Sequence, residues 1–352
     1  MANALKITYL FESTALWGGN KVALEQAEAL SDMGYHISIV SRDSGPSWYP
    51  LKLPVISAPI LDAATIPESD IIVGTYWPTV KAAYESKRGV AVHLCQGYEG
   101  GNKELVSQKA AIDEVYSYKI PKLTVSPHLN TFLKERFDAE TYYIGQMITR
   151  DIFFPSRDQS FQKGNDSFTI LVVGIFEADV KNIRTALRGI STAKSRLPVS
   201  PKLVRVSPFP LTGDETEIIK PDEYHFHVPY HSMGEIYRKA DLFISVSKEA
   251  EGFGLPALEA MACGVPTILS TISSYTSLDE NRDYALFVES TDYESLAGAI
   301  VKVFHDTPLR EKLIRRGLAV AQNFSKERVT RNLEAAFDAI LFKDKLTKKK
   351  HA

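Results

Sequence analysis

Residues 251–266 read Glu251-Gly-Phe-Gly-Leu-Pro256-Ala-Leu-Glu259-Ala-Met-Ala-Cys-Gly264-Val-Pro266. This run predicts a glycine loop that opens a short helix, because Pro256 suits the first helical position, where its missing N–H is not needed. Gly264 and Pro266 are expected to end the helix. A helix N-terminus attracts anions, so the backbone N–H groups of the loop are predicted to hold a phosphate.

Two carboxylates flank this loop. Glu251 precedes it and Glu259 follows eight positions later, so both can accept hydrogen bonds from hydroxyl groups of a bound molecule. A phosphate cradle between two hydroxyl acceptors describes a nucleotide-sugar site. The alternative is an ordinary turn with surface acids, which has little use for two glycines and two carboxylates. The predicted contacts of the ligand are therefore Glu251, Gly252, Phe253, Gly254, Leu255 and Glu259.

The composition bounds the class of protein. A chain of 352 residues with 44% hydrophobic and 24% charged residues suits two α/β domains. A formal net charge of −2 argues against a general nucleic-acid binder. The two cysteines, Cys95 and Cys263, show no disulfide or metal spacing. With no signal peptide and no apolar run near the ~20 residues that span a bilayer, we expect a cytoplasmic protein, at most peripheral to the inner face of the membrane.

Short β-branched runs alternate with helical patterns, which predicts parallel βαβ units. Polar residues 157–166 are expected to join two Rossmann-like, doubly wound domains that face one another across a cleft. The predicted domains are 1–157, 158–325 and a C-terminal segment 326–352, whose helix covers about 326–342. The predicted strands are 6–12, 36–42, 71–76, 90–96, 123–126 and 141–145, then 168–174, 202–207, 224–228, 242–247, 266–270 and 285–289.

Several loops are expected to line the cleft. The first strand leads into Trp17-Gly18-Gly19, a strand–glycine–helix turn that lacks the Gly-x-Gly-x-x-Gly fingerprint, so a nicotinamide cofactor is not supported. Aromatic residues at strand ends suit the flat face of a sugar acceptor, although they also cap sheets. Those that we assign to the acceptor are Trp17, Tyr76, Trp77 and Tyr98.

No metal site is predicted. The eight histidines form no His-x-x-x-His pattern or carboxylate cluster. His225 and His227 alternate on a predicted strand, so they face opposite sides and make poor joint ligands. His93 is interpreted as a histidine of the core or as one that supports a site residue from behind. We expect no cofactor.

The run 251–266 resembles the signature of the family 4 retaining glycosyltransferases, which have the GT-B fold. The resemblance implies an enzyme that transfers a hexose from a nucleoside diphosphate sugar, with retained anomeric configuration and no required divalent ion. The implied acceptor is a glycan, a lipid-linked sugar or a small molecule, as in polysaccharide biosynthesis. In that family the first glutamate contacts hydroxyls of the transferred sugar, and the second holds the donor ribose, which assigns these roles to Glu251 and Glu259.

Other positions match the family in part. Lys181-Asn182 resembles its Lys-Asn pair and implies a diphosphate clamp, but Ile175 stands where the family has arginine, with Arg184 as a substitute. Gly18 and Gly19 are implied to close over the donor phosphates, and Val228 lies near the base. Gln96 occupies the place of a histidine near the reacting carbon, which is similar to a rhamnosyltransferase-like subset. The last helix is implied to cross back onto the first domain.

Alternatives stay open from sequence alone. A sugar-nucleotide epimerase of GT-B type would use the same paired domains, and a binding protein could keep the site without catalysis. The basic tail from Lys343 is a solvated end or a weak contact with anionic lipid headgroups. The donor base and sugar, the acceptor and the oligomeric state are not readable.

Overall fold

The computed structural model describes residues 5–156 and 167–351. The chain forms two compact units. The first comprises the residues up to Met147 together with the segment from Lys326, and the second comprises Ile148–Ser325. The expected joint at 157–166 lies outside the described residues.

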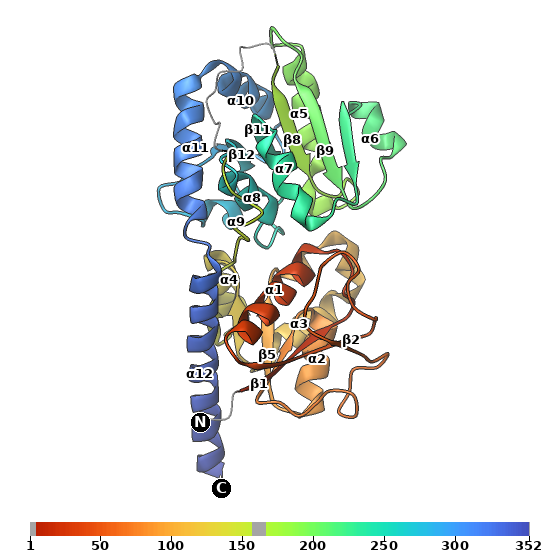
Figure 1. The fold of residues 1–352 in the computed structure, drawn as a ribbon, viewed down its shortest axis with the longest axis vertical. Coiled ribbons are helices and arrows are strands. Elements are labelled where there is room, and N and C mark those ends of the chain that lie inside the picture. The colour runs from red at the N-terminus through yellow and green to blue at the C-terminus, as the bar shows by residue number, and fades with distance from the viewer. Residues whose placement is uncertain (1–4, 157–166, 352) are drawn as a thin grey trace. The chain divides into compact units, whose positions relative to one another are not determined.

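Within the described residues, the first unit holds a seven-stranded sheet with the order β3-β2-β1-β4-β5-β6-β7 (Figure 1). All of its paired strands are parallel. The strands are β1 (Lys6–Phe11), β2 (His36–Ser41), β3 (Val55–Ser57), β4 (Ile71–Gly74), β5 (Val90–Cys95), β6 (Lys122–Thr124) and β7 (Thr141–Tyr143). The helices are α1 (Gly18–Asp32), α2 (Trp77–Ser86), α3 (Lys109–Ser117), α4 (Pro127–Phe137) and α12 (Lys326–His351), with short 3-10 turns η1 (Glu99–Gly101) and η2 (Lys103–Gln108).

The second unit holds a six-stranded parallel sheet, ordered β10-β9-β8-β11-β12-β13 among the residues that the structure covers. The strands are β8 (Thr169–Val173), β9 (Lys202–Ser207), β10 (Glu223–Phe226), β11 (Leu242–Ser245), β12 (Thr267–Ser270) and β13 (Leu286–Val288). The helices are α5 (Ile183–Lys194), α6 (Gly213–Ile218), α7 (Met233–Arg238), α8 (Leu255–Ala262), α9 (Ser273–Thr276), α10 (Tyr293–His305) and α11 (Thr307–Ala321), with 3-10 turns η3 (Asp179–Lys181) and η4 (Tyr230–Ser232).

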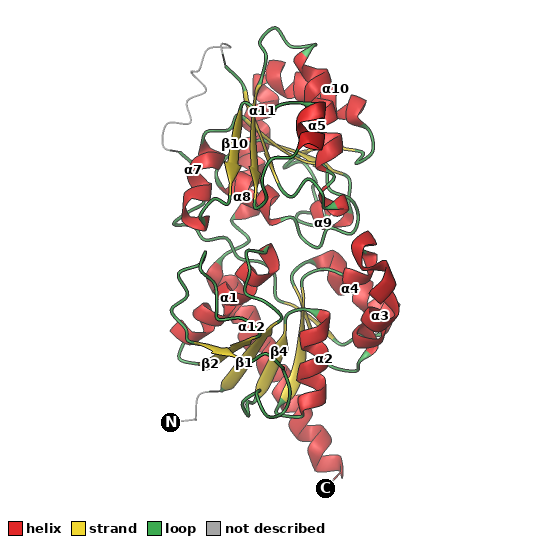
Figure 2. Cartoon of the chain, turned by 90° about the vertical axis from the view of Figure 1, so that its right-hand side faces the viewer, coloured by secondary structure: helices red, strands yellow, loops and turns green. Residues whose placement is uncertain are grey.

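Both sheets are covered by helices on their two faces, as Figure 2 shows within each unit. Several strands therefore consist of near-continuous apolar runs, and β4 and β12 are buried along their whole length. The predicted α/β fold class is confirmed. Each predicted strand coincides with an observed one, with ends that differ by at most two residues.

One observed strand was not predicted from the sequence. β3 (Val55–Ser57) has three residues, lies at the edge of the first sheet and exposes two of them. A run this short carries no measurable periodicity, so its pairing with β2 decides its structure.

The boundary between the units falls at Met147/Ile148, ten residues before the expected 157/158. The reason is that the segment after Met147 packs on the second unit. The hydroxyl of Tyr230 donates to Thr149 at 3.0 Å, and Arg238 donates to the carbonyl oxygen of Ile152 at 2.9 Å.

The C-terminal helix α12 is longer than the expected 326–342 and groups with the first unit. Lys326 pairs with Asp32 of α1 at 2.7 Å, and Tyr35 donates to Glu334 at 3.0 Å. The helix continues past the sheet because its last turns are rich in lysine, a good helix former.

Candidate functional site

The glycine loop opens α8 in the second unit, as the sequence predicts. Gly254 immediately precedes the helix with φ +80°, a left-handed conformation that side chains disfavour. A Cβ atom at Gly254 would lie 2.1 Å from Cε1 of Tyr275, so the ring of Tyr275 also requires glycine there. Pro256 lies in the first turn, and Gly264 has φ +74° after the helix ends. The loop is therefore fixed both by backbone conformation and by packing.

Glu251 and Lys181 form an ion pair, although 70 positions separate them. Nζ of Lys181 lies 2.7 Å from Oε2 of Glu251, and the hydroxyl of Ser247 donates to the same oxygen at 3.1 Å. Glu251 is 9% exposed. Both of these side-chain contacts are made by Oε2. Within the described residues, Oε1 accepts no hydrogen bond from the protein. One carboxylate oxygen is thus held, and the other is available to a ligand.

Lys181 reaches Glu251 because hydrogen bonds hold η3 against the loop after β11. The backbone N–H of Lys248 donates to the carbonyl of Val180 at 2.9 Å. The side-chain amide of Asn182 donates to the carbonyls of Val246 at 2.8 Å and Ser290 at 2.6 Å. Asn182 adopts φ +50°, which asparagine tolerates better than most residues. The Lys-Asn pair therefore joins two loops as well as presenting an amine.

Glu259 is buried on α8 and accepts a hydrogen bond at Oε2 from the hydroxyl of Tyr237, at 2.9 Å. Burial, and then the nearby Glu259 carboxylate, raises the pKa of Tyr237 well above its ordinary value. The phenol therefore stays protonated and donates. Sequence analysis did not single out Tyr237, since its partner on α8 lies 22 positions away.

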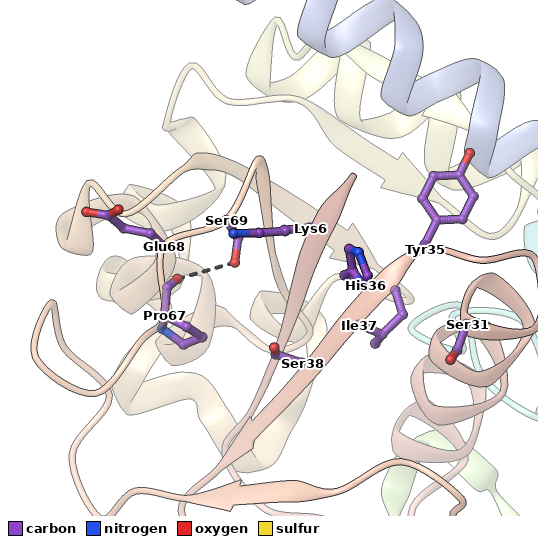
Figure 3. A pocket seen from close by; sticks show the side chains of 9 residues that line it. All are labelled: Lys6, Ser31, Tyr35, His36, Ile37, Ser38, Pro67, Glu68 and Ser69. Atoms are coloured by element: carbon purple, nitrogen blue, oxygen red, sulfur yellow. Dashed lines mark hydrogen bonds between the residues drawn. The ribbon is translucent and has the colours of Figure 1, made fainter. Parts of the chain in front are cut away.

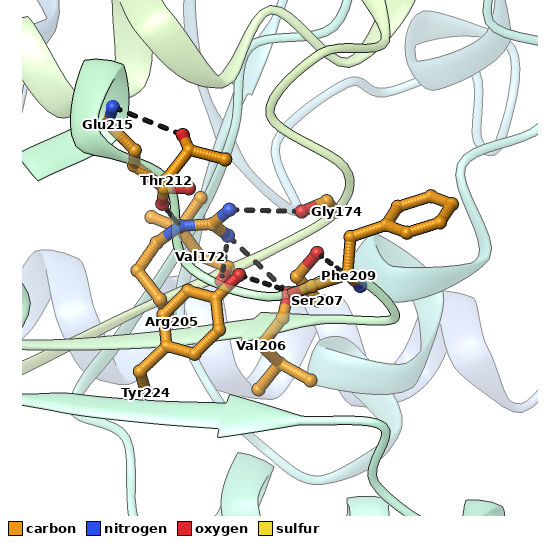
Figure 4. Close-up of polar contacts among 9 residues, drawn as sticks. All are labelled: Val172, Gly174, Arg205, Val206, Ser207, Phe209, Thr212, Glu215 and Tyr224. Carbon is orange, nitrogen blue, oxygen red and sulfur yellow. Dashed lines mark hydrogen bonds and ion pairs between the residues drawn. The ribbon is translucent and has the colours of Figure 1, made fainter.

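The place that the resemblance gives to an arginine holds Ile175, and the guanidinium of the expected substitute Arg184 packs over the ring of Phe176. Its Cζ lies 4.7 Å from the centroid of the Phe176 ring. A different cation lies buried beside this turn. Arg205 on β9 contacts the carbonyl of Gly174 at 3.0 Å and pairs with Glu215 (Figure 4). An arginine inside the apolar run Leu-Val-Arg-Val was the one signal in the sequence that pointed to it.

In the first unit, two predicted site residues meet. Nε2 of Gln96 donates to the carbonyl oxygen of Gly19 at 2.9 Å, so the end of β5 supports the first turn of α1. Gly18 is the first residue of α1, and Trp17 precedes it with 49% of its surface exposed. The structure brings Gln96 and the Gly18-Gly19 turn together.

The remaining aromatic candidates differ in their contacts with other side chains. Tyr76 precedes α2 and Trp77 begins it, with their ring centroids 6.2 Å apart. The hydroxyl of Tyr98 binds Asp113, and Nζ of Lys109 lies 2.8 Å from the same hydroxyl. Val228, the predicted neighbour of the base, follows β10 in the second unit and is half-buried.

The buried histidine and cysteines of the described residues do not form a metal site. His93 is 1% exposed, and its burial lowers its pKa well below the ordinary value, so the ring is neutral. Cys95 and Cys263 are both buried free thiols, and burial raises the pKa of each to about 12. Across residues 5–156 and 167–351, no group of three or more His, Cys, Asp or Glu side chains could hold a metal ion.

A cavity of about 460 Å³ lies in the first unit at the other end of the strands (Figure 3). Its lining includes Lys6 and His36, the first residues of β1 and β2. Ligands of open parallel sheets bind beyond the carboxyl ends of the strands, where Gly18 and Gln96 lie. This cavity is therefore separate from the candidate site.

In the part of the chain that the structure describes, no helix is both long enough and apolar enough to cross a membrane.

Known proteins resemble part of this sequence. Residues 214–319 match the family model Glycosyl transferases group 1. Over 107 residues, 30% of this chain, the sequence is 36% identical to O-antigen chain mannosyltransferase B of Escherichia coli, of which it covers 27%. Over 123 residues it is 30% identical to the lipopolysaccharide core biosynthesis mannosyltransferase LpsB of Rhizobium meliloti, covering 35% of that protein. The match thus spans about a third or less of each relative.

Solved structures resemble the whole chain. Sucrose-phosphate synthase from Thermosynechococcus elongatus gives a TM-score of 0.75 at 18% identity, covering 96% of this chain and 99% of that one. The Anabaena protein HepE, solved with UDP-glucose, gives 0.77 at 15% identity and covers 95% and 100%. At these identities the likeness concerns the fold. The chain therefore has the GT-B fold, and residues 214–319 match the glycosyl transferases group 1 family.

Proposed function

We propose that this protein is a retaining hexosyltransferase of the family 4 type. It transfers a sugar from a nucleoside diphosphate donor to a carbohydrate, lipid-linked or small-molecule acceptor. One observation carries the proposal: Glu251 and Glu259 stand on either side of the glycine loop, with the amine of Lys181 at 2.7 Å from Glu251. Names of relatives support the same class, since they include two mannosyltransferases and a D-inositol 3-phosphate glycosyltransferase. HepE is a structural neighbour that was solved with UDP and with UDP-glucose.

Lys181 and the backbone N–H groups of residues 252–255 hold the diphosphate. Negative charge grows on the leaving diphosphate as the bond to the sugar breaks. A preorganised cation and a helix N-terminus stabilise that charge without reorganisation, which lowers the barrier. Lys181 is already oriented by its ion pair and by the fastening of η3, so little side-chain freedom is lost on binding.

The two carboxylates bind opposite ends of the donor. Oε2 of Glu251 is occupied by Lys181 and Ser247, so Oε1 accepts from hydroxyls of the transferred sugar. Glu259 accepts from the donor ribose while Tyr237 holds its Oε2. Val228 lies against the base. This division explains why both acids are needed on one glycine loop.

Retention follows from a departing phosphate oxygen that takes the proton of the acceptor on the face where the bond breaks. Gln96 fits this scheme, because an amide can hydrogen-bond a sugar hydroxyl but cannot act as a general base. No divalent ion is required, since Lys181 and α8 supply the positive charge.

The first unit supplies the acceptor side in this proposal. Trp17, Tyr76, Trp77 and Tyr98 offer aromatic surface to a sugar ring in this proposal. Gly18 and Gly19 approach the donor phosphates. We place the protein in the cytoplasm, with the lysine-rich end of α12 as a weak contact with the inner face of the membrane.

The test is a donor panel of UDP, GDP, TDP and ADP sugars, first by thermal shift and then with mixed glycan and lipid-linked acceptors. We expect one donor to raise the unfolding temperature, because a ligand that binds the folded state stabilises it. Proton NMR of the product should show the anomeric configuration of the donor. An inverted product would refute retention, and a new sugar isomer formed from donor alone would make the protein an epimerase. Binding without turnover on any acceptor would make it a binding protein.

A further inference from the structure

A buried ion pair lies beneath the turn that leads to Lys181. The side chains of Arg205 on β9 and Glu215 on α6 are 0% and 1% exposed and contact each other (Figure 4). Thr212 caps α6 by accepting from the backbone N–H of Glu215, which fixes the position of this carboxylate. A buried ion pair is weak evidence for stability, because desolvation offsets the attraction between the charges. This buried pair, which joins β9 to α6, therefore calls for another role.

The guanidinium of Arg205 holds the end of the neighbouring strand. Nη1 donates to the carbonyl of Val172 at 2.8 Å, and Nη2 donates to the carbonyl of Gly174 at 3.0 Å. Arg205 stands directly opposite Val172 in the sheet register. Gly174 follows β8 with φ +144°, where the chain leaves the sheet for η3. One side chain thus fixes two carbonyls at the point where the turn begins.

Gly174 in turn supports Lys181. A Cβ atom at Gly174 would lie 3.6 Å from Cγ and 3.7 Å from Cβ of Lys181, so the stem of this lysine packs over the glycine. The chain of contacts therefore runs from Glu215 through Arg205 and Gly174 to Lys181, whose amine reaches Glu251.

We propose that Arg205, held by Glu215, is a positioning residue that sets the turn after β8 and thereby the amine of Lys181. Arg205 is fully buried and donates hydrogen bonds to Glu215 and to backbone carbonyls. It therefore acts on a ligand only through Lys181. Its guanidinium contacts the carbonyl of Gly174, the residue before Ile175, so a structural cation replaces a direct one at that place. The effect on catalysis rests on the proposed function, whereas the effect on the turn does not.

The experiment replaces both charges, because removing one partner leaves an unpaired buried charge and endangers folding. The variant Arg205→Met/Glu215→Leu keeps the buried volume and removes the pair. The control is Arg310→Met. Arg310 is another nearly buried arginine of this unit, which donates to the carbonyl of Val303 at 2.8 Å, far along the chain from η3. If the double variant does not fold, Arg205→Lys replaces it, since one amine cannot hold both carbonyls and Glu215.

The first readout is hydrogen exchange of the amides of residues 174–181, which needs no substrate. We expect exchange at least about tenfold faster in the double variant and unchanged in Arg310→Met. Unchanged exchange in the double variant would overturn the proposal.

The second readout is a double-mutant cycle on kcat/KM. We expect the double variant to lose about 10- to 100-fold in the wild-type background, as misplacing a distant support can. In a Lys181→Ala background the same change should cost less than about twofold, because Arg205 then has nothing to position. Equal losses in both backgrounds would overturn the proposal. Faster exchange in a protein whose wild type has no transferase activity would refute the proposed function and leave the positioning role supported.

Discussion

The hydroxyl of Tyr237 on α7 donates to Oε2 of Glu259 on α8 at 2.9 Å, and both side chains are buried. This hydrogen bond orients one of the two carboxylates that flank the glycine loop. It links two short helices that are separated in sequence by the strand β11, so it depends on the tertiary structure of the second unit.

Tyr237→Phe should weaken donor binding with little effect on chemistry. The variant removes one hydrogen bond to a carboxylate, a change of about 1.5–3 kcal/mol that corresponds to roughly 10- to 100-fold in donor KM. We expect kcat to stay within about twofold, since Glu259 contacts the ribose equally in ground and transition states. Steady-state kinetics check this. Tyr49→Phe is the matched control, because Tyr49 donates to Glu28 in the first unit. A KM equal to that of wild type would show that Tyr237 does not orient Glu259.

Glu251→Ala should reduce turnover by about 10²-fold or more, as loss of a positioned transition-state contact does. The fold should survive, which circular dichroism and the unfolding temperature report. The control is Glu249→Ala, an exposed acid two residues away that accepts from the backbone of Ser273. Wild-type turnover in Glu251→Ala would remove this residue from the mechanism.

Gly254→Ala should destabilise the protein and abolish donor binding. The added Cβ meets the ring of Tyr275 at 2.1 Å, and the residue has φ +80°, so both packing and backbone resist the change. We expect a loss of about 1–3 kcal/mol or more of unfolding free energy, measured in urea. Gly298→Ala on α10 provides the comparison, because its Cβ meets nothing within 4 Å and alanine favours a helix by about 0.5–1 kcal/mol. Equal stabilities of the two variants would contradict this account.

Glu99 should make the wild-type protein less stable as pH rises. Burial raises the pKa of Glu99 to about 7, against opposing hydrogen bonds from Tyr116 and the backbone. The folded state therefore binds more protons than the unfolded state between the ordinary glutamate pKa and about 7. The stabilisation from this proton is fully present below the ordinary value and is lost as pH rises through about 7.

The measurement for Glu99 is the unfolding free energy from pH 4 to 8 in wild type and Glu99→Gln. As pH rises across that range, the unfolding free energy of wild type should fall relative to that of Glu99→Gln. Contributions from other groups, such as His93, are present in both proteins and cancel. A difference that is independent of pH would show that the Glu99 carboxyl titrates normally.

Chelation should leave turnover unchanged within about twofold, since the proposed site neutralises the diphosphate with Lys181 and the N-terminus of α8. Turnover is measured in excess EDTA and again after adding Mg²⁺ or Mn²⁺. Loss in EDTA with recovery on adding one ion would show that a metal is required.

Local residue patterns are enough to predict the two sheets. Their strands are near-continuous apolar runs separated by helical patterns, a local signal that is readable without contacts, so β1, β8 and the other long strands were predicted to within two residues. These patterns missed β3, whose three residues depend on pairing with β2. The glycine loop around Gly254 was also predicted, because a backbone with positive φ favours glycine over other residue types.

Which side chains meet could not be predicted from the sequence, because it depends on contacts between distant positions. Lys181 and Glu251 are 70 positions apart and Gln96 and Gly19 are 77 apart, and such distances carry no periodic signal. The partners of Tyr237 and Arg205 were likewise hidden, because a buried polar side chain is chosen by the donors and acceptors packed around it. Local residue types thus fixed the elements, and long-range packing fixed the contacts between them.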